Sequence, residues 1–396
     1  MKKILNFFKQ NNIGEPPYEY DFLYNLPESE YPKYLKKIYK YRTGENLNLK
    51  HPKTFNEKIQ WIKLYGVTQL MRDCTDKVKV RDYVKERIGE EYLKPVLQII
   101  GACHSENSGN QNDNLVDFQV VQKLKEEKSK RSQQAWCPPE LVSGSDIQEE
   151  KMLKHACVND DIQNENINHT AVQHDRPIID FIPNSTDVST YFDRINWDKL
   201  PNSFVLKCNH GCKWQYIIKD KEQFLQNKRL FDIVKRQMTG WLEQEFWVFE
   251  GFELQYKGIE PKILIELLIR EEINTQCEEI QVYCFNGIPK IFIKFFDENK
   301  MSIWNKNFES IDNIFDFKEE NIINRTLDIL YSKEISRLSE QLSEQFDFLR
   351  VDWMLYKNKL YFEELTFTPY SGFHFFKDKN NNLKLGQLIN LERQTK

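Results

Sequence analysis

The run RVDWMLYKNKLYFEELTFTP, residues 350–369, constrains the fold of this chain more than any other segment. Its two halves are rich in aromatic and branched side chains, which is typical of β-strands. Between them lies the polar sequence KNK at 357–359, which is typical of a turn. The run therefore predicts two antiparallel strands, and a three-residue loop would place Tyr356 opposite Leu360.

The same register gathers charged side chains on one face of the hairpin. Counting outward from the loop puts Asp352 opposite Glu364 and Arg350 opposite Thr366. Side chains alternate faces with a period of two, so all four point the same way. Two opposed carboxylates repel each other, so either a divalent cation such as Mg²⁺ binds both or Arg350 neutralises the pair. A two-residue turn would instead move Glu364 off the face of Asp352.

Helices and strands alternate irregularly along the rest of the chain. Apolar residues at helical spacing predict helices between 34 and 88, over about 221–245 and over 321–346. Short apolar runs predict strands, and turn signals at 209–211 and at Asn286-Gly287 predict hairpins. Besides the C-terminal hairpin, strands are predicted at 96–100, 204–207, 262–269, 278–285 and 289–296. Hairpins between helices favour a mixed α+β fold over a doubly wound parallel sheet.

A long polar segment interrupts this pattern from Gly101 to about Arg176. It consists mostly of Asn, Gln, Ser, Glu, Asp and Lys and far exceeds an ordinary connection in length. We interpret it as an inserted, largely disordered segment. The expected division of the chain is a helix-rich segment 1–100, the insert 101–178, and two further units at 179–260 and 261–396.

Composition and charge exclude several classes of protein. Apolar residues make up 40% of the 396 residues, which favours a globular chain, and a net charge of −4 with scattered Lys and Arg argues against nucleic-acid binding. The N-terminal apolar stretch is too short for a signal peptide, and no run of about 18 apolar residues predicts a transmembrane helix. We therefore expect a cytoplasmic protein whose eight cysteines are free thiols.

Two charged residues on predicted strands are candidates for ligand binding. Lys207 ends an apolar strand just before a small loop that contains Gly211, where an ammonium can reach a phosphate. A solvated lysine at a strand end is the alternative. Glu266 lies within an apolar strand, where an unpaired carboxylate is costly. Its partner is either a nucleotide's amino or hydroxyl groups or a nearby cation such as Lys262.

Several runs of the sequence, taken together, resemble a known family. They are HPKTFNEKIQWIKLYG at 51–66, Asp76-Lys77, LPNSFVLKCNHG at 200–211, Gln255-Tyr256, YCFNGIPK at 283–290, and RVDWMLY with YFEELTFTPYSGF. Their order and spacing are similar to those of the TupA-like ATP-grasp family, which is associated with teichuronopeptide and other surface-polysaccharide synthesis. The resemblance covers residues of about 30–100 and 180–390.

The resemblance implies an ATP-grasp fold, with ATP between the two α+β subdomains 179–260 and 261–396, and roles for particular residues. It implies nucleotide binding by Lys77, Lys207, His210, Gly211 and Glu266. It implies catalytic roles for Arg350 and Lys207, and Mg²⁺ binding by Asp352, Glu364 and Thr366. Lys77 and Lys207 would meet phosphates, Glu266 the adenine and ribose, and Arg350 the transferring phosphate or acyl phosphate.

The chain departs from the family's pattern at three positions. Trp214 stands in a loop that is usually rich in glycine and small residues, and Gln281 stands where the family has a lysine. Glu363 replaces a glycine before the metal-binding glutamate, and by alternation we expect it to face away from Glu364.

The expected function is that of an ATP- and Mg²⁺-dependent ligase joining an amino acid or amine to a carboxylate through an acyl phosphate. The expected carboxylate substrate is a surface glycan or its precursor, and no nucleic-acid partner is expected. Two alternatives stay open. The departures from the pattern are consistent with a catalytically degenerate ATP-grasp scaffold, and paired carboxylates also occur in a glycosyltransferase that binds a nucleotide sugar.

Overall fold

The computed structural model describes residues 23–102, 187–249, 251–269, 278–296, 300–311, 313–318, 321–322 and 329–391. Nearly all of the predicted insert at 101–178 lies outside the described residues, so its disorder stays a prediction. The helix predicted over 321–346 is described as α10, Ile329–Ser343.

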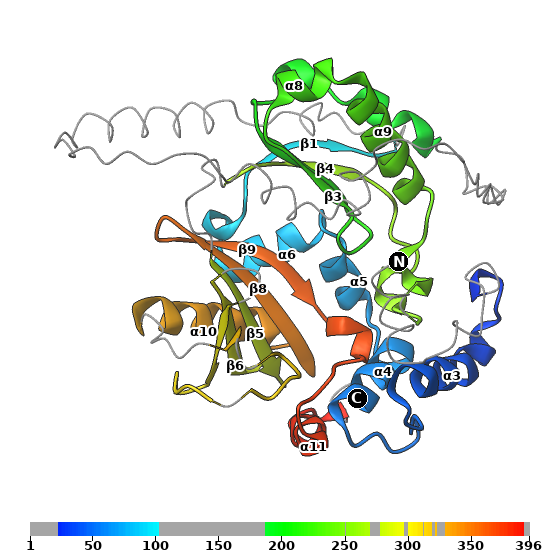
Figure 1. The fold of residues 1–396 in the computed structure, drawn as a ribbon, viewed down its shortest axis with the longest axis vertical. Coiled ribbons are helices and arrows are strands. Elements are labelled where there is room, and N and C mark those ends of the chain that lie inside the picture. Colours follow the sequence, from blue (N-terminus) through cyan, green and yellow to red (C-terminus); the bar gives the residue numbers. More distant parts are fainter. Residues whose placement is uncertain are drawn as a thin grey trace, which may run out of the picture.

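Two antiparallel sheets form the framework, which confirms the predicted α+β class (Figure 1). The four-stranded sheet has the order β1-β4-β2-β3 and the five-stranded sheet the order β7-β6-β5-β8-β9. The strands of the first are β1 Val96–Ile100, β2 Phe204–Cys208, β3 Gln215–Ile218 and β4 Ile263–Leu267. Those of the second are β5 Glu278–Phe285, β6 Ile288–Phe295, β7 Met301–Asn305, β8 Phe348–Tyr356 and β9 Lys359–Thr366. The predicted boundary at 260 falls just before β4, which pairs with β1 and β2.

The β8–β9 hairpin has a tighter turn than predicted. Tyr356 pairs with Lys359, not with Leu360, so the turn has two residues. Lys357 and Asn358 both have positive φ, at 48° and 62°, as a type I′ turn requires. The prediction of a three-residue loop is therefore wrong, because the chain accepts left-handed backbone at two non-glycine positions.

A β-bulge nevertheless restores the predicted face. Trp353 pairs with Phe362 while Asp352 pairs with Glu364, so Glu363 is an extra residue on β9. The bulge offsets the shorter turn by one residue. The predicted pairing of Asp352 with Glu364 is confirmed, as is that of Arg350 with Thr366.

Helices precede and follow the sheets. The helix-rich N-terminal segment contains α3 Tyr31–Thr43, α4 Phe55–Tyr65, α5 Gln69–Thr75 and α6 Val80–Ile88. Thr54 and Glu57 form a capping box at the start of α4, which fixes the position of that helix's first turn. The helix predicted at 221–245 is two helices, α8 Lys221–Gln226 and α9 Lys228–Leu242. Asn227 separates them, because its side chain accepts a hydrogen bond from the backbone of Leu230 and caps α9.

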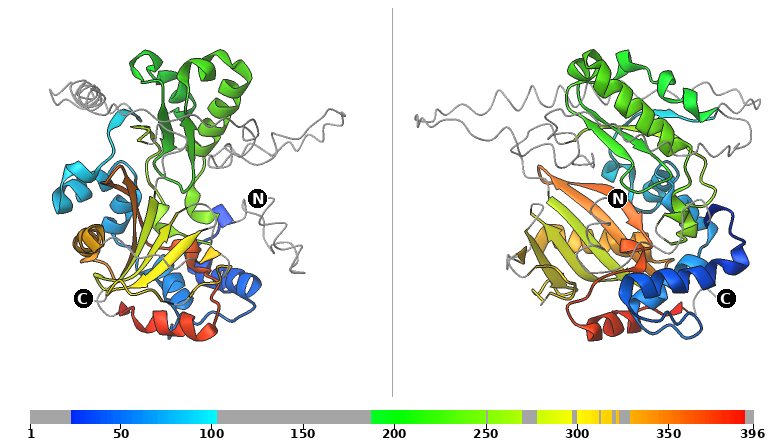
Figure 2. Two further views of the ribbon diagram at one scale, coloured as in Figure 1. Left: turned by 60° about the vertical axis from the view of Figure 1, so that its left-hand side comes forward. Right: turned by 45° about the vertical axis from the view of Figure 1, so that its right-hand side comes forward.

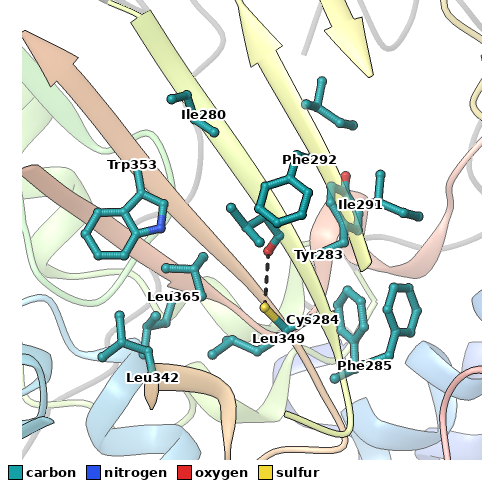
Figure 3. Close-up of a cluster of buried hydrophobic side chains, with 14 of the residues drawn as sticks. Ile280, Tyr283, Cys284, Phe285, Ile291, Phe292, Leu342, Leu349, Trp353 and Leu365 are labelled. Atoms are coloured by element: carbon teal, nitrogen blue, oxygen red, sulfur yellow. Dashed lines mark hydrogen bonds between the residues drawn. The ribbon is translucent and has the colours of Figure 1, made fainter. Parts of the chain in front are cut away.

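One face of the five-stranded sheet is apolar and packs on α10 (Figure 3). Ile280 and Cys284 of β5 and Trp353 of β8 lie in this layer, together with Leu342 of α10. The indole of Trp353 donates a hydrogen bond to Ser339 Oγ at 2.9 Å, which satisfies its one polar atom. Because strand side chains alternate, the neighbouring positions on β5 and β8 point to the opposite face.

The helices α5 and α6 lie between the two sheets (Figures 1 and 2). The four-stranded sheet carries α8 and α9, and a separate apolar cluster joins it to α9. At the other end of the molecule α3 and α4 lie near α11, Lys379–Gln387. Residues 77–81, which follow α5, lie beside β2 and β4 of one sheet and β9 of the other. The candidate site lies between these segments.

Candidate active site

The face of the five-stranded sheet that points away from α10 carries a block of polar side chains. Three neighbouring strands each contribute two residues in direct register. Across β5, β8 and β9 these rows are Gln281, Asp352 and Glu364, and Tyr283, Arg350 and Thr366. Local strand alternation therefore places the predicted acid pair and the arginine side by side.

Arg350 is the centre of this block. Its Nε and one terminal nitrogen donate to the two oxygens of Asp352 at 2.7 and 2.5 Å. That terminal nitrogen also lies 3.1 Å from Thr366 Oγ1 and 3.4 Å from Glu364 Oε1. Burial alone would lower the pKa of Arg350, but Asp352, Tyr283 and Glu364 hold it well above its ordinary value. The guanidinium therefore stays charged and neutralises the carboxylate pair.

The residues predicted to bind Mg²⁺ lie together, and their chemistry suits that ion. Among the described residues no group of three or more His, Cys, Asp or Glu side chains could hold a metal by itself. Asp352 and Glu364 supply two carboxylates, and Thr366 Oγ1 is 3.1 Å from Glu364 Oε1. Mg²⁺ in nucleotide sites is usually held by one or two carboxylates together with substrate phosphates. The donor set fits a metal that a nucleotide brings with it.

The pKa values of the two carboxyls shift in opposite directions because their surroundings differ. Burial raises the pKa of Asp352, and Glu364 and Glu279 add to this effect, whereas Arg350 opposes it. Burial would also raise the pKa of Glu364, but Lys77, Arg350 and Thr366 bring it below its ordinary value. The side chain of Glu364 is 35% exposed, so it is an accessible anionic oxygen ligand.

A second ionic cluster surrounds Glu266 on β4. Its carboxylate lies 2.7 Å from Lys207 Nζ and 3.4 Å from a terminal nitrogen of Arg81. Lys262, the partner considered from the sequence, instead lies 3.8 Å from Glu260. Burial alone would raise the pKa of Glu266, but Lys207, Lys94 and Arg81 hold it below its ordinary value. Burial would lower the pKa of Lys207, but Glu266, Glu363 and Glu364 raise it, so both partners are charged.

Lys77 joins this region to the loop after β2. Its ammonium donates to the carbonyl oxygen of Gly211 at 2.5 Å. The loop is fixed by Asn209, whose amide donates to Asp76 Oδ1 at 2.9 Å. Gly211 is required by packing, since an added Cβ would lie 2.3 Å from the ring of Trp214. Trp214 itself is buried against Trp241 in the core of the four-stranded sheet.

His210 lies in the loop after β2, and its predicted contact with the nucleotide stays a prediction. The ring is buried, with Nε2 3.1 Å from the carbonyl oxygen of Trp241 and Nδ1 3.2 Å from Asn209 Oδ1. Burial lowers its pKa to about 4, so the imidazole is neutral at pH 7. A neutral imidazole carries one N–H, so His210 donates a hydrogen bond to one of these two oxygens.

Glu363 does not face away from Glu364 as alternation predicts. As the bulge residue it escapes the strict two-residue period, and it lines the same cleft as Glu364. It forms an ion pair with Lys94, which precedes β1. Sequence reasoning missed Arg81, Lys94 and Glu363 as parts of the site. Of these three, only Arg81 could have been found from the sequence, because it lies four residues after the predicted nucleotide-binding residue Lys77.

These groups line one cleft between the two sheets, with a volume of about 500 Å³ that includes space open to solvent. Its walls come from α5 and residues 77–81, from β2 and β4, and from β9. The charged lining residues are Lys77, Arg81, Lys207, Glu266, Glu363 and Glu364. Glu364 belongs both to this cleft and to the Arg350 block, so the two clusters form one continuous site.

A comparison with protein families gives the site its context. Residues 164–390 match the model of the family described as TupA-like ATPgrasp. The chain belongs to the TupA-like ATP-grasp family. This confirms the predicted family and, with it, the ATP-grasp fold. The match to the TupA-like model includes β2 to β9 but not Lys77 or α4, so the predicted role of Lys77 rests on its position in the cleft.

Solved structures that resemble the chain do so at low similarity. D-alanine-D-alanine ligase from Helicobacter pylori is 16% identical, with 51% of this chain and 53% of the ligase covered and a TM-score of 0.29. The Bacillus anthracis ligase complexed with ATP is 15% identical, with 50% and 55% covered and a TM-score of 0.26. Cdc123 from Schizosaccharomyces pombe is 12% identical, with 55% and 78% covered and a TM-score of 0.27. The chain spans about half the length of the two ligases.

No curated protein sequence matches the chain. Within the part of the chain that the structure describes, no helix has both the length and the apolar character needed to cross a membrane. The family assignment therefore rests on the TupA-like family model alone.

Proposed function

We propose that this protein is an ATP- and Mg²⁺-dependent ligase that joins a carboxylate to an amine. One observation carries the proposal: Lys77, Lys207 and Glu364 line one cleft. Arg350, which binds Asp352, adjoins that cleft through Glu364, 3.4 Å away. Phosphoryl transfer requires cations at the phosphates and positioning of the reactants more than covalent help from the protein. This charge arrangement suits that requirement.

In the proposed reaction an oxygen of the substrate carboxylate attacks the γ-phosphorus of ATP, and ADP leaves. The amine then attacks the carbonyl carbon of the acyl phosphate, and inorganic phosphate leaves. Lys77 and Lys207 bind phosphate oxygens, exchanging their present contacts with Gly211 and Glu266 for the nucleotide. Arg350 binds the transferring phosphate. Asp352, Glu364 and Thr366 would hold Mg²⁺, which supplies charge that offsets that of the phosphates.

We infer the carboxylate substrate from the family to which the chain belongs. TupA-like proteins are associated with surface-polysaccharide synthesis, so the proposed substrate is a uronic acid on a glycan or its precursor. The proposed amine is an amino acid. The polar block around Arg350 suits this class, because a guanidinium matches the geometry of a carboxylate or phosphate.

The test is release of ADP from Mg-ATP by the purified protein, offered a panel of uronic acids paired with amino acids. The proposal expects ADP release that needs both substrates and is abolished in Asp352→Asn. Asp193→Asn is the matched control, because it breaks an exposed ion pair with Lys235 far from the cleft. Absence of ADP release above background with every pair would refute the proposal.

A non-catalytic ATP-grasp scaffold is the second candidate. Its support is that Asp352 is already bound on both oxygens by Arg350 and that Gln281, a neutral residue, lies beside it. A scaffold would bind Mg-ATP without turnover. Substrate-dependent ADP release that Asp352→Asn abolishes excludes it, and a preference for a UDP-sugar over ATP would point to the glycosyltransferase alternative.

A further inference from the structure

Helix α4 carries a buried polar stripe that the proposed function does not explain. Asn56, Gln60 and Lys63 follow one another at spacings of four and three residues, so they lie on one face of the helix. All three are buried, and Lys63 is 0% exposed. Buried polar side chains, and a buried ammonium above all, are costly unless hydrogen bonds satisfy them. Apolar packing alone therefore does not account for these three polar side chains.

The stripe forms hydrogen bonds with the segment 371–374, which follows β9. Lys63 Nζ donates to the carbonyl oxygen and Oγ of Ser371 at 3.0 and 2.9 Å. Gln60 Nε2 donates to the carbonyl oxygens of Ser371 and Gly372 at 3.0 and 2.9 Å. Asn56 exchanges two hydrogen bonds with the backbone of His374, at 2.9 and 3.1 Å. Six hydrogen bonds between α4 and this segment thus hold Ser371, Gly372 and His374.

The backbone held in this way is strained. Tyr370, Ser371 and Gly372 all have positive φ, at 50°, 53° and 71°, and only glycine adopts that conformation at no cost. The helix also presses closely on the turn, since a Cβ added at Gly372 would lie 2.7 Å from Gln60 Nε2 and 2.9 Å from Ile59 Cγ2. Strained backbone persists only where its surroundings fix it, and it gathers at functional sites.

The turn presents an aromatic side chain that His374 and Tyr283 connect to Arg350. Tyr370 is 57% exposed, and its ring centroid lies 4.6 Å from that of His374. Nε2 of His374 lies 3.5 Å from the hydroxyl of Tyr283, which pairs directly with Arg350 across β5 and β8. A continuous row of side chains therefore runs from Arg350 to the exposed ring of Tyr370.

We propose that Lys63 is a positioning residue, which holds the turn 369–372 so that Tyr370 contacts the carboxylate-bearing substrate next to Arg350. The inference rests on the proposed ligase function and adds where that substrate lies: on the Tyr370 side of Arg350, away from the nucleotide cleft around Lys207 and Glu266. The exposed ring offers an apolar face to a ring-bearing substrate. The role of Lys63 is indirect, because both of its hydrogen bonds are to Ser371 in the turn and neither is to a group in the cleft.

The experiment measures KM for ATP and for D-glucuronate separately, by ADP release, in the full chain. Lys63→Met removes the ammonium at nearly constant volume, and Tyr370→Ala removes the exposed ring. Ser371→Gly removes the hydroxyl that accepts a hydrogen bond from Lys63, so the turn is held less firmly. Glycine also adopts the positive φ of this position without strain, so the protein's stability is maintained. Tyr65→Ala is the matched control, an exposed tyrosine on the same helix, 51% exposed.

The expected result is a rise of about tenfold or more in KM for D-glucuronate in Lys63→Met, Tyr370→Ala and Ser371→Gly, with KM for ATP changed less than about twofold. Tyr65→Ala is expected to change neither. Equal rises in both KM values, or wild-type kinetics in Tyr370→Ala, would overturn the inference while leaving the ligase proposal standing. If Lys63→Met does not fold, Ser371→Gly and Tyr370→Ala decide the matter. Wild-type protein that releases no ADP with any substrate pair overturns both proposals.

Discussion

Replacing Glu266 by glutamine tests whether the cleft is held together by its own ion pairs before a nucleotide binds. The carboxylate lies 2.7 Å from Lys207 and 3.4 Å from Arg81, and all three side chains are largely buried. Glutamine keeps the size of the side chain and removes its charge. Lys207 then stays buried without its nearest counter-charge.

The distances give the size of the expected effect. With an effective dielectric constant of about 20, a charge pair at 2.7 Å is worth about 6 kcal/mol and one at 3.4 Å about 5 kcal/mol. Removing the ions from water costs several kcal/mol for each, so the intact pair contributes little net stability. Removing the charge of Glu266 alone leaves the desolvation cost of Lys207 uncompensated. We therefore expect Glu266→Gln to lower the free energy of unfolding by about 3–5 kcal/mol.

A double-mutant cycle separates this effect from a general packing loss. Urea unfolding followed by circular dichroism would be measured for wild type, Glu266→Gln, Lys207→Met and the double variant. The double variant should be more stable than the sum of the single effects predicts, with a coupling energy of about 2 kcal/mol. Additivity within about 0.5 kcal/mol would refute the reasoning, since it would mean that the two charges do not depend on each other.

Three further predictions concern the acid stability of Glu266, the close contact at Gly386 and the turn at 357–358. The pKa of Glu266 in the folded protein is held below its ordinary value of about 4.5. The stabilisation that its charge provides is therefore present above pH 4.5 and is lost as the pH falls through the pKa of the folded state. On acidification the urea midpoint should fall more steeply in wild type than in Glu266→Gln. Gly386→Ala should destabilise the protein by about 1–3 kcal/mol in urea unfolding, because a Cβ there lies 2.2 Å from the carbonyl oxygen of Lys53, and an unchanged midpoint would contradict that contact. Replacing Lys357-Asn358 by Asn-Gly should stabilise by about 0.5–1 kcal/mol, since both positions have positive φ; a lower melting temperature would count against a two-residue turn.

The β8–β9 hairpin shows what local pattern could and could not predict. Alternation of side chains predicted both strands and the pairing of Asp352 with Glu364. The two-residue turn and the bulge at Glu363 were not predicted, because Lys357 and Asn358 lack the glycine that usually marks such a turn. The two errors offset each other in the strand register, so the predicted pairing of Asp352 with Glu364 is correct although the predicted loop length is wrong.

Residues whose role depends on distant parts of the chain were less predictable. Glu266 pairs with Lys207 because β2 and β4 are neighbours in a sheet whose strands are not consecutive. Adjacency in sequence favoured Lys262 instead. The ring of His210 lies beside the carbonyl of Trp241 at the end of α9, and adjacency in sequence did not indicate this contact. Neither tertiary contact leaves a local signal.

The central claim is that a nucleotide and Mg²⁺ bind together beside Asp352, and thermal unfolding with ligands tests it most directly. Wild type and Asp352→Asn would be measured with ATP alone, Mg-ATP and Mg-UDP-glucose. Mg-ATP at about 100 times its dissociation constant should stabilise the wild type by about 2.7 kcal/mol, ATP without Mg²⁺ should do so less, and the magnesium-dependent part should vanish in Asp352→Asn. A wild type that Mg-ATP does not stabilise, or an equal shift in the variant, would contradict the account.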